Sequence, residues 1–241
     1  MRYMGMPDDD EPWPDSSAAL DEVQKRLATT PMSLWQPPGP EVVALLPSIA
    51  GTFVCFGRGG SGAGERGDQG WAGAAWFVNG ELAATATARA TAAAAYDPGH
   101  LALREGPLHE AALRRLPTLP ELLLVDATGR DHPRRAGLAL HLGAKLRCAS
   151  VGVTNRLLVA TGDLPADEPG AVSPFTFDGE TVGWWLRVRR GVRPLAVHAA
   201  WRTDATTALA IVQTTLSRVR TPEPLRFARR LAREARARGT R

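Results

Sequence analysis

The segment from Trp71 to Arg89 constrains the fold of this chain more than any other. It contains two strand-like runs, Trp71 to Val78 and Glu81 to Arg89, separated only by Asn79-Gly80. An Asn-Gly pair between two such runs is a strong signal for a type I′ hairpin, because both turn residues need positive φ angles. A third apolar run, Thr52 to Phe56, precedes the hairpin. Together they predict three consecutive antiparallel strands.

After this meander the pattern changes to alternating strands and helices. The expected strands are "ELLLVDA", "CASVGVT" and a hairpin of "TVGWWLRVRR" with "RPLAVHAAW". The expected helices cover about Ala18 to Ala28, Leu108 to Leu116 and Leu138 to Leu146, with two more starting near Asp204 and after "TPEP". Three antiparallel strands followed by β-α units predict an α/β protein with a central mixed sheet, the layout of a ribonuclease H-like fold.

The glycines after the first strand raise a second possibility. In "TFVCFGRGGSG", Gly57, Gly59 and Gly62 have the G-x-G-x-x-G spacing of a dinucleotide-binding loop. Such a loop must lead directly into a helix whose N-terminal amides hold the pyrophosphate. The residues that follow add more glycine and no helical period. We therefore expect a mobile hairpin loop here.

Length and composition favour one domain. With 241 residues and 44% hydrophobic content the chain can bury one core. We expect a disordered acidic segment at 1–22, a single domain at 23–236 and a basic tail at 237–241. No apolar run is long enough to cross a bilayer, and the N-terminus lacks the pattern of a signal peptide. We expect a cytoplasmic monomer whose two cysteines, Cys55 and Cys148, are reduced core residues.

The net charge of +4 hides an asymmetry. Residues 1–22 carry seven acidic residues against Arg2, whereas Leu225 to Arg241 carry seven arginines against Glu234. A basic helix suits a polyanionic partner, but a solvated helix face is the commoner explanation for such arginines.

Asp126 is the first candidate for chemistry, because it follows a buried strand directly. Ligands gather at the carboxyl ends of strands, and a carboxylate there suits magnesium, although it can also cap a turn. The following His132-Pro133-Arg134-Arg135 is equally compatible with a surface turn in which Pro133 starts a helix.

Several motifs make the resemblance specific. "DATGRDHPRRAGLALHLG" resembles the endonuclease V pattern D-G-x-G-x-x-H-P-R-R-x-G-x-A-x-H-L-G, and "YDPGHLALREGP" resembles the family's P-Y-x-P-G-x-L-x-F-R-E-x-P segment. "SVGVTNRLL", "LAVHAAWRTDATTALAIV" and "TPEPLRFARRLA" are similar to three further family segments in the same order. The likeness covers roughly Gln24 to Arg236.

This resemblance implies a magnesium-dependent nuclease that recognises deaminated purines, chiefly hypoxanthine, in DNA or RNA. By position, Glu105 and Asp126 would be the catalytic, metal-binding carboxylates and Tyr96 the wedge that enters the duplex. The pocket for an extruded base would be shaped by Gly99, Leu101 and His132, with Arg134 and Arg135 also binding nucleic acid.

The departures from the family pattern argue against magnesium binding and cleavage. Phe53 stands where the resemblance implies a metal-binding aspartate, Asn155 where it implies lysine and Trp201 where it implies histidine. Ala127 replaces a glycine and adds a methyl group to the expected base pocket. A phenyl ring offers no oxygen to magnesium, so we expect magnesium binding to be weak or absent. We also expect Phe53 and Trp201 to be buried.

Three function classes stay open. The leading one is a nucleic-acid-binding relative with lost or impaired cleavage. The first alternative is an active, divergent magnesium-dependent endonuclease in DNA repair, for which Glu65, Asp68 or Asp97 would have to rebuild a metal site. The second alternative is a fold reused for an unrelated partner.

Overall fold

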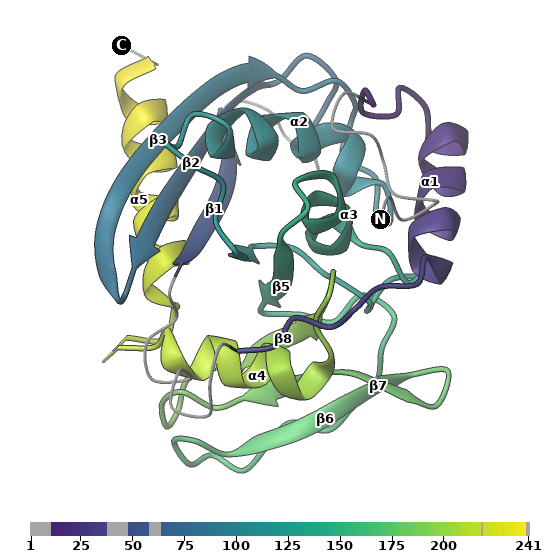
Figure 1. Cartoon of the computed structure of the whole chain (residues 1–241), viewed down its shortest axis with the longest axis vertical. Helices are drawn as coiled ribbons and strands as arrows, with labels where there is room; N and C mark the ends of the chain where they lie inside the picture. Colours follow the sequence, from purple (N-terminus) through teal and green to yellow (C-terminus); the bar gives the residue numbers. More distant parts are fainter. Residues whose placement is uncertain (1–10, 38–47, 58–63, 218, 240–241) are drawn as a thin grey trace.

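The computed structural model describes residues 11–37, 48–57, 64–217 and 219–239, and its centre is one eight-stranded mixed sheet (Figure 1). The strand order is β3-β2-β1-β4-β5-β8-β7-β6. The strands are β1 (Ser48–Phe56), β2 (Gln69–Val78), β3 (Glu81–Thr91), β4 (Leu122–Val125), β5 (Ala149–Thr154), β6 (Val172–Phe177), β7 (Glu180–Leu186) and β8 (Leu195–Ala199). The helices are α1 (Ser17–Thr29), α2 (Leu101–Leu113), α3 (Leu138–Lys145), α4 (Ala205–Thr214) and α5 (Glu223–Gly239).

The predicted three-stranded meander is confirmed. Strand β1 pairs antiparallel with β2, which pairs antiparallel with β3. Asn79 and Gly80 form the turn between β2 and β3 with φ angles of 50° and 81°, as a type I′ turn requires. Strand β4 then lies parallel to β1 on its other side, and β5 lies parallel to β4. The ribonuclease H-like α/β fold is therefore the observed one.

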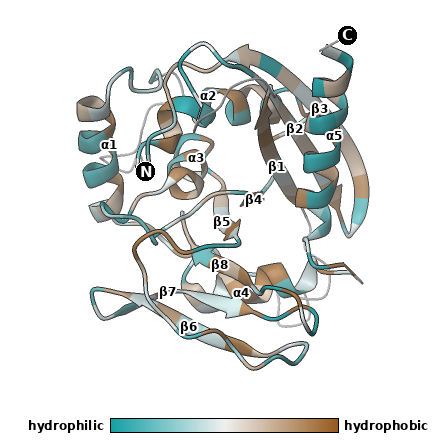
Figure 2. Ribbon diagram, turned by 180° about the vertical axis from the view of Figure 1, so that it is seen from behind, coloured by the Kyte–Doolittle hydropathy of each residue, from teal (hydrophilic) through white to brown (hydrophobic). Residues whose placement is uncertain are grey.

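Both faces of the sheet are covered by helices (Figures 1 and 2). Helices α2 and α3 pack on one face, with α1 beyond them, and α4 and α5 pack on the other. All four side chains of β4 are fully buried, as expected for a strand with a core on each face. Leu123 and Val125 pack toward α2 and α3, whereas Leu122 and Leu124 belong to the core under α4 and α5.

Helix α5 lies unusually close to the meander because small residues meet at the contact. A Cβ atom added to Gly51 would collide with the backbone of Pro224, and one added to Gly73 would collide with the carbonyl oxygen of Ala228. Ala228 itself is fully buried at this contact. This close approach fixes where the arginines of α5 lie relative to the ends of β1 and β4.

Three details differ from the expectations or add to them. Helix α2 begins at Leu101 rather than near Leu108, with Gly106 and Pro107 inside it, although both residues normally disfavour helix interiors. Strand β6 was not expected; it pairs with β7 through Asp178-Gly179, whose φ angles are 50° and 77°. Most of the glycine-rich loop, 58–63, lies outside the described residues, and the next described element after β1 is the strand β2.

Both cysteines are free thiols. Cys148 is buried in the core, whereas Cys55, also expected there, is only partly buried. Within the described ranges, no helix is both long and apolar enough to cross a membrane.

Candidate active site and nucleic-acid interface

The candidate site lies where β1 and β4 end side by side. The two strands are parallel, with Thr52 opposite Val125, so Phe53 and Asp126 come next to each other at the same edge. Thr52 points to the α2 face, where its hydroxyl lies 2.8 Å from Nδ1 of His109. Since side chains alternate along a strand, Phe53 points to the opposite face, toward α5.

An arginine of α5 occupies this corner. Nη2 of Arg229 donates a hydrogen bond to Oδ2 of Asp126 over 3.0 Å. The same guanidinium lies over the Phe53 ring, 5.0 Å from its centroid, and Arg233 lies 5.8 Å from the same centroid. A cation over an aromatic face is attracted by the ring quadrupole. The one carboxylate at the end of β4 is thus neutralised by a side chain of the protein.

Phe53 was expected to be a largely buried core residue, but it belongs to none of the hydrophobic core clusters of the described residues. Its side chain is half-buried, because the ring forms a platform under two guanidiniums and does not enter the hydrocarbon core. A base stacked on this ring would have to compete with Arg229 and Arg233, which lie over it.

The side chains at this edge do not fit a magnesium site. In the part of the chain that the structure describes, no three His, Cys, Asp or Glu side chains are grouped to hold a metal ion. Glu105 lies on α2 beside His109, with 3.6 Å between Oε2 and Nε2, and it does not line the hollows around Asp126. A hard cation at Asp126 would lie beside the positive charge of Arg229, and Phe53 would offer it no oxygen.

The three neighbouring acids do not replace the missing ligand. Oδ2 of Asp68 accepts a 2.6 Å hydrogen bond from Arg104, which together with the backbone amide of Glu65 lowers the pKa of Asp68. Asp97 pairs with Nδ1 of His100 over 2.7 Å. The Glu65 side chain is exposed.

Beside the Asp126 corner lies a hollow of about 160 Å³, which we call the base pocket. It brings together most of the residues expected to bind nucleic acid. Its lining includes Gln24, Tyr96, Gly99, Leu101, Asp126, Ala127, Thr128, His132, Thr154 and Leu158. Tyr96 is 44% exposed at its rim, and Ala127 is buried in its wall.

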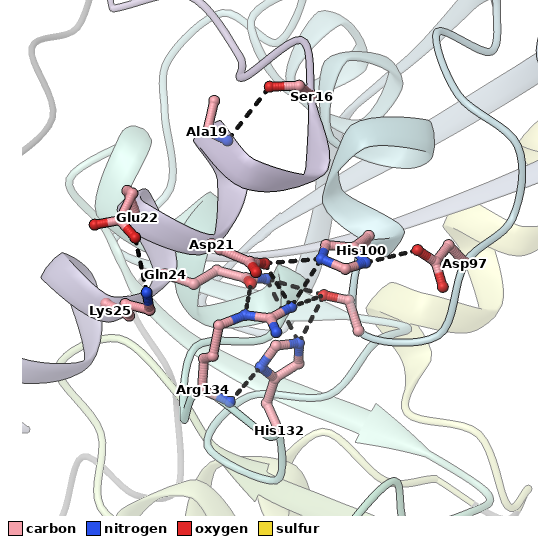
Figure 3. Close-up of polar contacts among 11 residues, drawn as sticks. Ser16, Ala19, Asp21, Glu22, Gln24, Lys25, Asp97, His100, His132 and Arg134 are labelled. Carbon is pink, nitrogen blue, oxygen red and sulfur yellow. Dashed lines mark hydrogen bonds and ion pairs between the residues drawn. The ribbon is translucent and has the colours of Figure 1, made fainter.

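A polar network fixes the wall of the base pocket (Figure 3). The carbonyl oxygen of Gly99 accepts hydrogen bonds from Gln24 over 3.2 Å, from His132 over 3.0 Å and from Arg134 over 3.0 Å. Gly99 has a φ of +85°, a conformation that side chains rarely adopt. Asp21 of α1 completes the network by pairing with His100 and Arg134.

His132 is held neutral inside this network. Burial lowers the pKa of His132 to about 4, against the opposing effect of its hydrogen bond to Gly99. Its Nδ1 accepts the backbone N–H of Arg134 over 3.1 Å, so Nε2 carries the proton that goes to Gly99. His132 therefore lines the base pocket, and Arg134 supports its wall through the hydrogen bond to Gly99.

Arg135 is placed elsewhere. Its guanidinium binds Glu180 and the carbonyl oxygen of Phe177 and lies over the Phe177 ring. It holds the loop after β4 to the β6–β7 hairpin, so the structure does not bring it to the base pocket.

Two further hollows continue from the base pocket. The first, which we call the Asp126 cleft, has a volume of about 190 Å³ and is lined by Asp126, Thr154, Asn155, Arg220, Thr221 and Arg229 among others. The second, the α5 groove, has a volume of about 450 Å³ and is lined by Thr221, Arg226, Arg229, Arg230, Arg233, Glu234 and Ala237. Asp126 and Thr154 line both the base pocket and the Asp126 cleft, and Thr221 and Arg229 line both the cleft and the groove.

Of the replaced family positions, the structure brings Phe53, Asn155 and Ala127 to this region but not Trp201. Trp201 is buried, as expected, with 1% of its surface exposed. It exchanges hydrogen bonds with Ser150 at the start of β5, whereas Asn155 follows the end of that strand. The indole is a core residue at the other end of the sheet.

Sequence reasoning missed three residues that build the site. Arg229 and Arg220 reach Asp126 and the cleft only through the tertiary packing of the last hundred residues. Asp131 is fully buried and accepts hydrogen bonds from the backbone amides of Leu158, Val159 and Ala160, which fixes the wall of the base pocket. An aspartate inside "GRDHP" gave no local signal for this long-range contact.

Comparison with known proteins agrees with the motifs. The family model for endonuclease V matches residues 63–230. Endonuclease V of Roseiflexus sp. strain RS-1 is 36% identical over 225 residues, which cover 92% of this chain and 95% of that protein.

Solved structures agree as well. The crystal structure of endonuclease V from Streptomyces avermitilis is 31% identical, with a TM-score of 0.81 over 95% of this chain and 96% of that one. Endonuclease V of Ciona intestinalis, solved with a 24mer DNA containing an inosine, has the same fold at 20% identity, with a TM-score of 0.72 over 92% of this chain and 98% of that one. The chain described here belongs to the endonuclease V family.

Proposed function

We propose that this endonuclease V family member binds inosine-containing nucleic acid and has lost its magnesium-dependent cleavage, or retains it only in strongly impaired form. The observation that carries the proposal is the Arg229–Asp126 pair over the Phe53 ring. A guanidinium stands beside the carboxylate that would have to bind the metal, and the neighbouring strand supplies a hydrocarbon ring.

Cleavage is disfavoured by the positive charge beside Asp126 and by the small number of carboxylates available to metal ions. Two-metal phosphoryl chemistry needs ions about 4 Å apart, held by several carboxylates. Here Asp126 already has a partner, and Glu105 does not share its hollow. Asn155 in the Asp126 cleft cannot supply the positive charge of a lysine to a reacting phosphate.

The binding half of the proposal rests on the base pocket. An enzyme that inspects a base edge takes the base out of the stack into a closely fitting pocket, often with an aromatic side chain at its entrance. The hollow of about 160 Å³ is of the scale of one nucleobase, and Tyr96 stands exposed at its rim. Its polar wall is held by the Gly99 network, so it exists before any ligand enters. The Ala127 methyl group narrows it, so we expect only a weak preference for inosine over ordinary purines.

The test uses an end-labelled single-stranded oligonucleotide with one inosine, beside its unmodified counterpart. We expect no shortened product with magnesium or manganese, and salt-dependent binding measured by fluorescence anisotropy in EDTA. Tyr96→Ala should weaken binding about tenfold, because stacking on an aromatic ring contributes about 1–3 kcal/mol. Leu164→Ala, a change at another exposed apolar side chain outside the base pocket, is the matched control.

The other outcomes each select an alternative. Inosine-specific cutting by the unaltered protein would establish an active, divergent endonuclease and overturn the proposal. Absence of binding to any oligonucleotide would favour a fold that serves an unrelated partner.

A further inference from the structure

The three hollows form one continuous path across the surface, and this is the starting observation. The base pocket and the Asp126 cleft share two lining residues, and the cleft and the α5 groove share two others. A nucleotide whose base enters the pocket therefore has its own phosphates at the cleft, and the adjoining nucleotides face α5.

The charge along this path is balanced at the Arg229–Asp126 pair and becomes positive beyond it. In the base pocket and the cleft the charge of Asp126 is cancelled by Arg229, over 3.0 Å. Beyond that pair the cations dominate. Arg220 in the cleft donates to the carbonyl oxygens of Arg193 and Pro194, and among the described residues it has no carboxylate partner. A strand that leaves the base pocket thus meets increasing positive charge.

Arg233 is the best placed of these cations. It is exposed, lies over the Phe53 ring and lines the α5 groove. No carboxylate of the described chain lies within ion-pair distance of it. The three other groove arginines, Arg226, Arg229 and Arg230, pair with Glu223, Asp126 and Glu234 respectively. The aromatic platform orients its planar guanidinium and leaves its N–H groups for an outside acceptor. Phosphate oxygens are the acceptors that a guanidinium fork fits best.

We infer that the α5 groove is a phosphodiester-binding track, on which Arg233 and Arg229 hold the backbone of a strand whose base occupies the base pocket, without a metal ion. This inference rests on the proposed function and extends it by naming the path of the strand. Phe53 is then a positioning residue: its ring replaces a metal-binding side chain with a platform for two cations. Binding on such a track depends on salt and not on magnesium, since phosphate contacts release counterions.

The test compares Arg233→Gln with Arg238→Gln. Both changes remove one positive charge from exposed positions of α5, but Arg238 does not line the groove. Binding of a fluorescein-labelled inosine oligonucleotide is measured by anisotropy in EDTA from low to moderate salt. We expect Arg233→Gln to weaken binding about fivefold to tenfold at low salt and to reduce the slope of log K against log salt by about 1. Arg238→Gln should change affinity less than twofold and leave the slope unchanged.

A second measurement tests whether the strand follows the α5 groove or is only attracted by the overall positive charge of α5. Oligonucleotides are lengthened by five nucleotides on one side of the inosine and then on the other. One of the two extensions should strengthen binding to the unaltered protein and to Arg238→Gln, but not to Arg233→Gln.

The outcomes distinguish the two claims. If the unaltered protein binds with salt dependence but both variants behave alike, the track along α5 is wrong and the proposed function stands. If binding requires magnesium, the metal-free track is wrong. If the unaltered protein does not bind the oligonucleotide at all, both the track along α5 and the proposed function are wrong.

Discussion

At the scale of single residues, Arg229 decides the chemistry of the site more than Phe53 does. A phenylalanine at the end of β1 removes one ligand, but the guanidinium above it also satisfies Asp126. In an apolar core, an unpaired aspartate in place of Phe53 would be costly. At this position, however, a carboxylate would meet both Arg229 and Arg233.

This arrangement predicts that returning the aspartate alone does not create a metal site. In Phe53→Asp the new carboxylate should pair with Arg229 and Arg233, and magnesium should leave the melting temperature unchanged. In Phe53→Asp/Arg229→Gln, Asp126 loses its cation and the new carboxylate keeps only Arg233. Magnesium should then stabilise the fold by roughly 1 kcal/mol or more, or about 2–4 °C for a chain of this size. Differential scanning fluorimetry with sodium chloride of equal ionic strength as control measures the effect. A magnesium-dependent rise for the unaltered protein would contradict the account.

At the scale of elements, the placement of α5 determines the position of both arginines. Gly51 and Gly73 let the helix lie directly on β1 and β2, and Figure 2 shows the hydrophilic side of the helix turned outward from the sheet. The sequence left open whether these arginines form a solvated face, the commoner case, or meet a polyanionic partner. Arg229, with 32% of its side chain exposed, instead pairs with Asp126 of the same chain.

We therefore expect Gly73→Ala to act on the site from a distance. Its Cβ would collide with the Ala228 carbonyl, so α5 must shift away from the sheet. Overpacking of this kind typically costs about 1–3 kcal/mol, and the shift should also weaken oligonucleotide binding. Gly57→Ala is the control, because its nearest neighbours would be 3.9 Å away. Urea unfolding measures the loss of stability, and fluorescence anisotropy measures the loss of oligonucleotide binding. If Gly73→Ala is destabilised but binds as before, α5 is not part of the nucleic-acid interface.

The sequence could predict the features that depend on neighbouring residues, but not the contacts between residues far apart in the chain. The Asn79-Gly80 turn, the buried β4 ahead of Asp126 and the N-cap at Asp204 depend on neighbouring residues, and all three are found. The Arg229–Asp126 pair joins residues 103 positions apart, and the Asp131 contacts span 27 to 29 positions. No local period or spacing encodes such contacts.

At the scale of the whole molecule, three buried histidines make stability depend on pH. Burial lowers the pKa of His132 to about 4, of His141 to about 3 and of His198 to about 4, from an ordinary value near 6.5. Below pH 6.5 the unfolded chain takes up protons on these residues while the folded chain does not. The unfolded state then binds more protons, so the free energy of unfolding falls as pH falls from about 6.5 toward 4.

The expected loss is up to about 1.4 kcal/mol per pH unit for each histidine that stays neutral in the fold. Urea unfolding at pH 7, 6 and 5 measures it. His132→Gln keeps a donor and an acceptor at the Gly99 network and should flatten the dependence by its share. A stability that rises on acidification would show that these histidines are charged in the folded protein.

The network of Figure 3 also bears on the order in which the molecule is assembled. Gln24 and Asp21 belong to the first helix, yet they bind groups 75 to 113 residues later in the chain, and Arg229 closes the Asp126 corner from the last helix. Contacts of such long range form slowly, because the intervening chain must be closed into loops first. On the ribosome, the strands of the meander emerge well before the helix that covers them. Under the proposed function, oligonucleotide binding therefore appears only after α5 has been synthesised, and a chain that ends before α5 carries the exposed sheet without it.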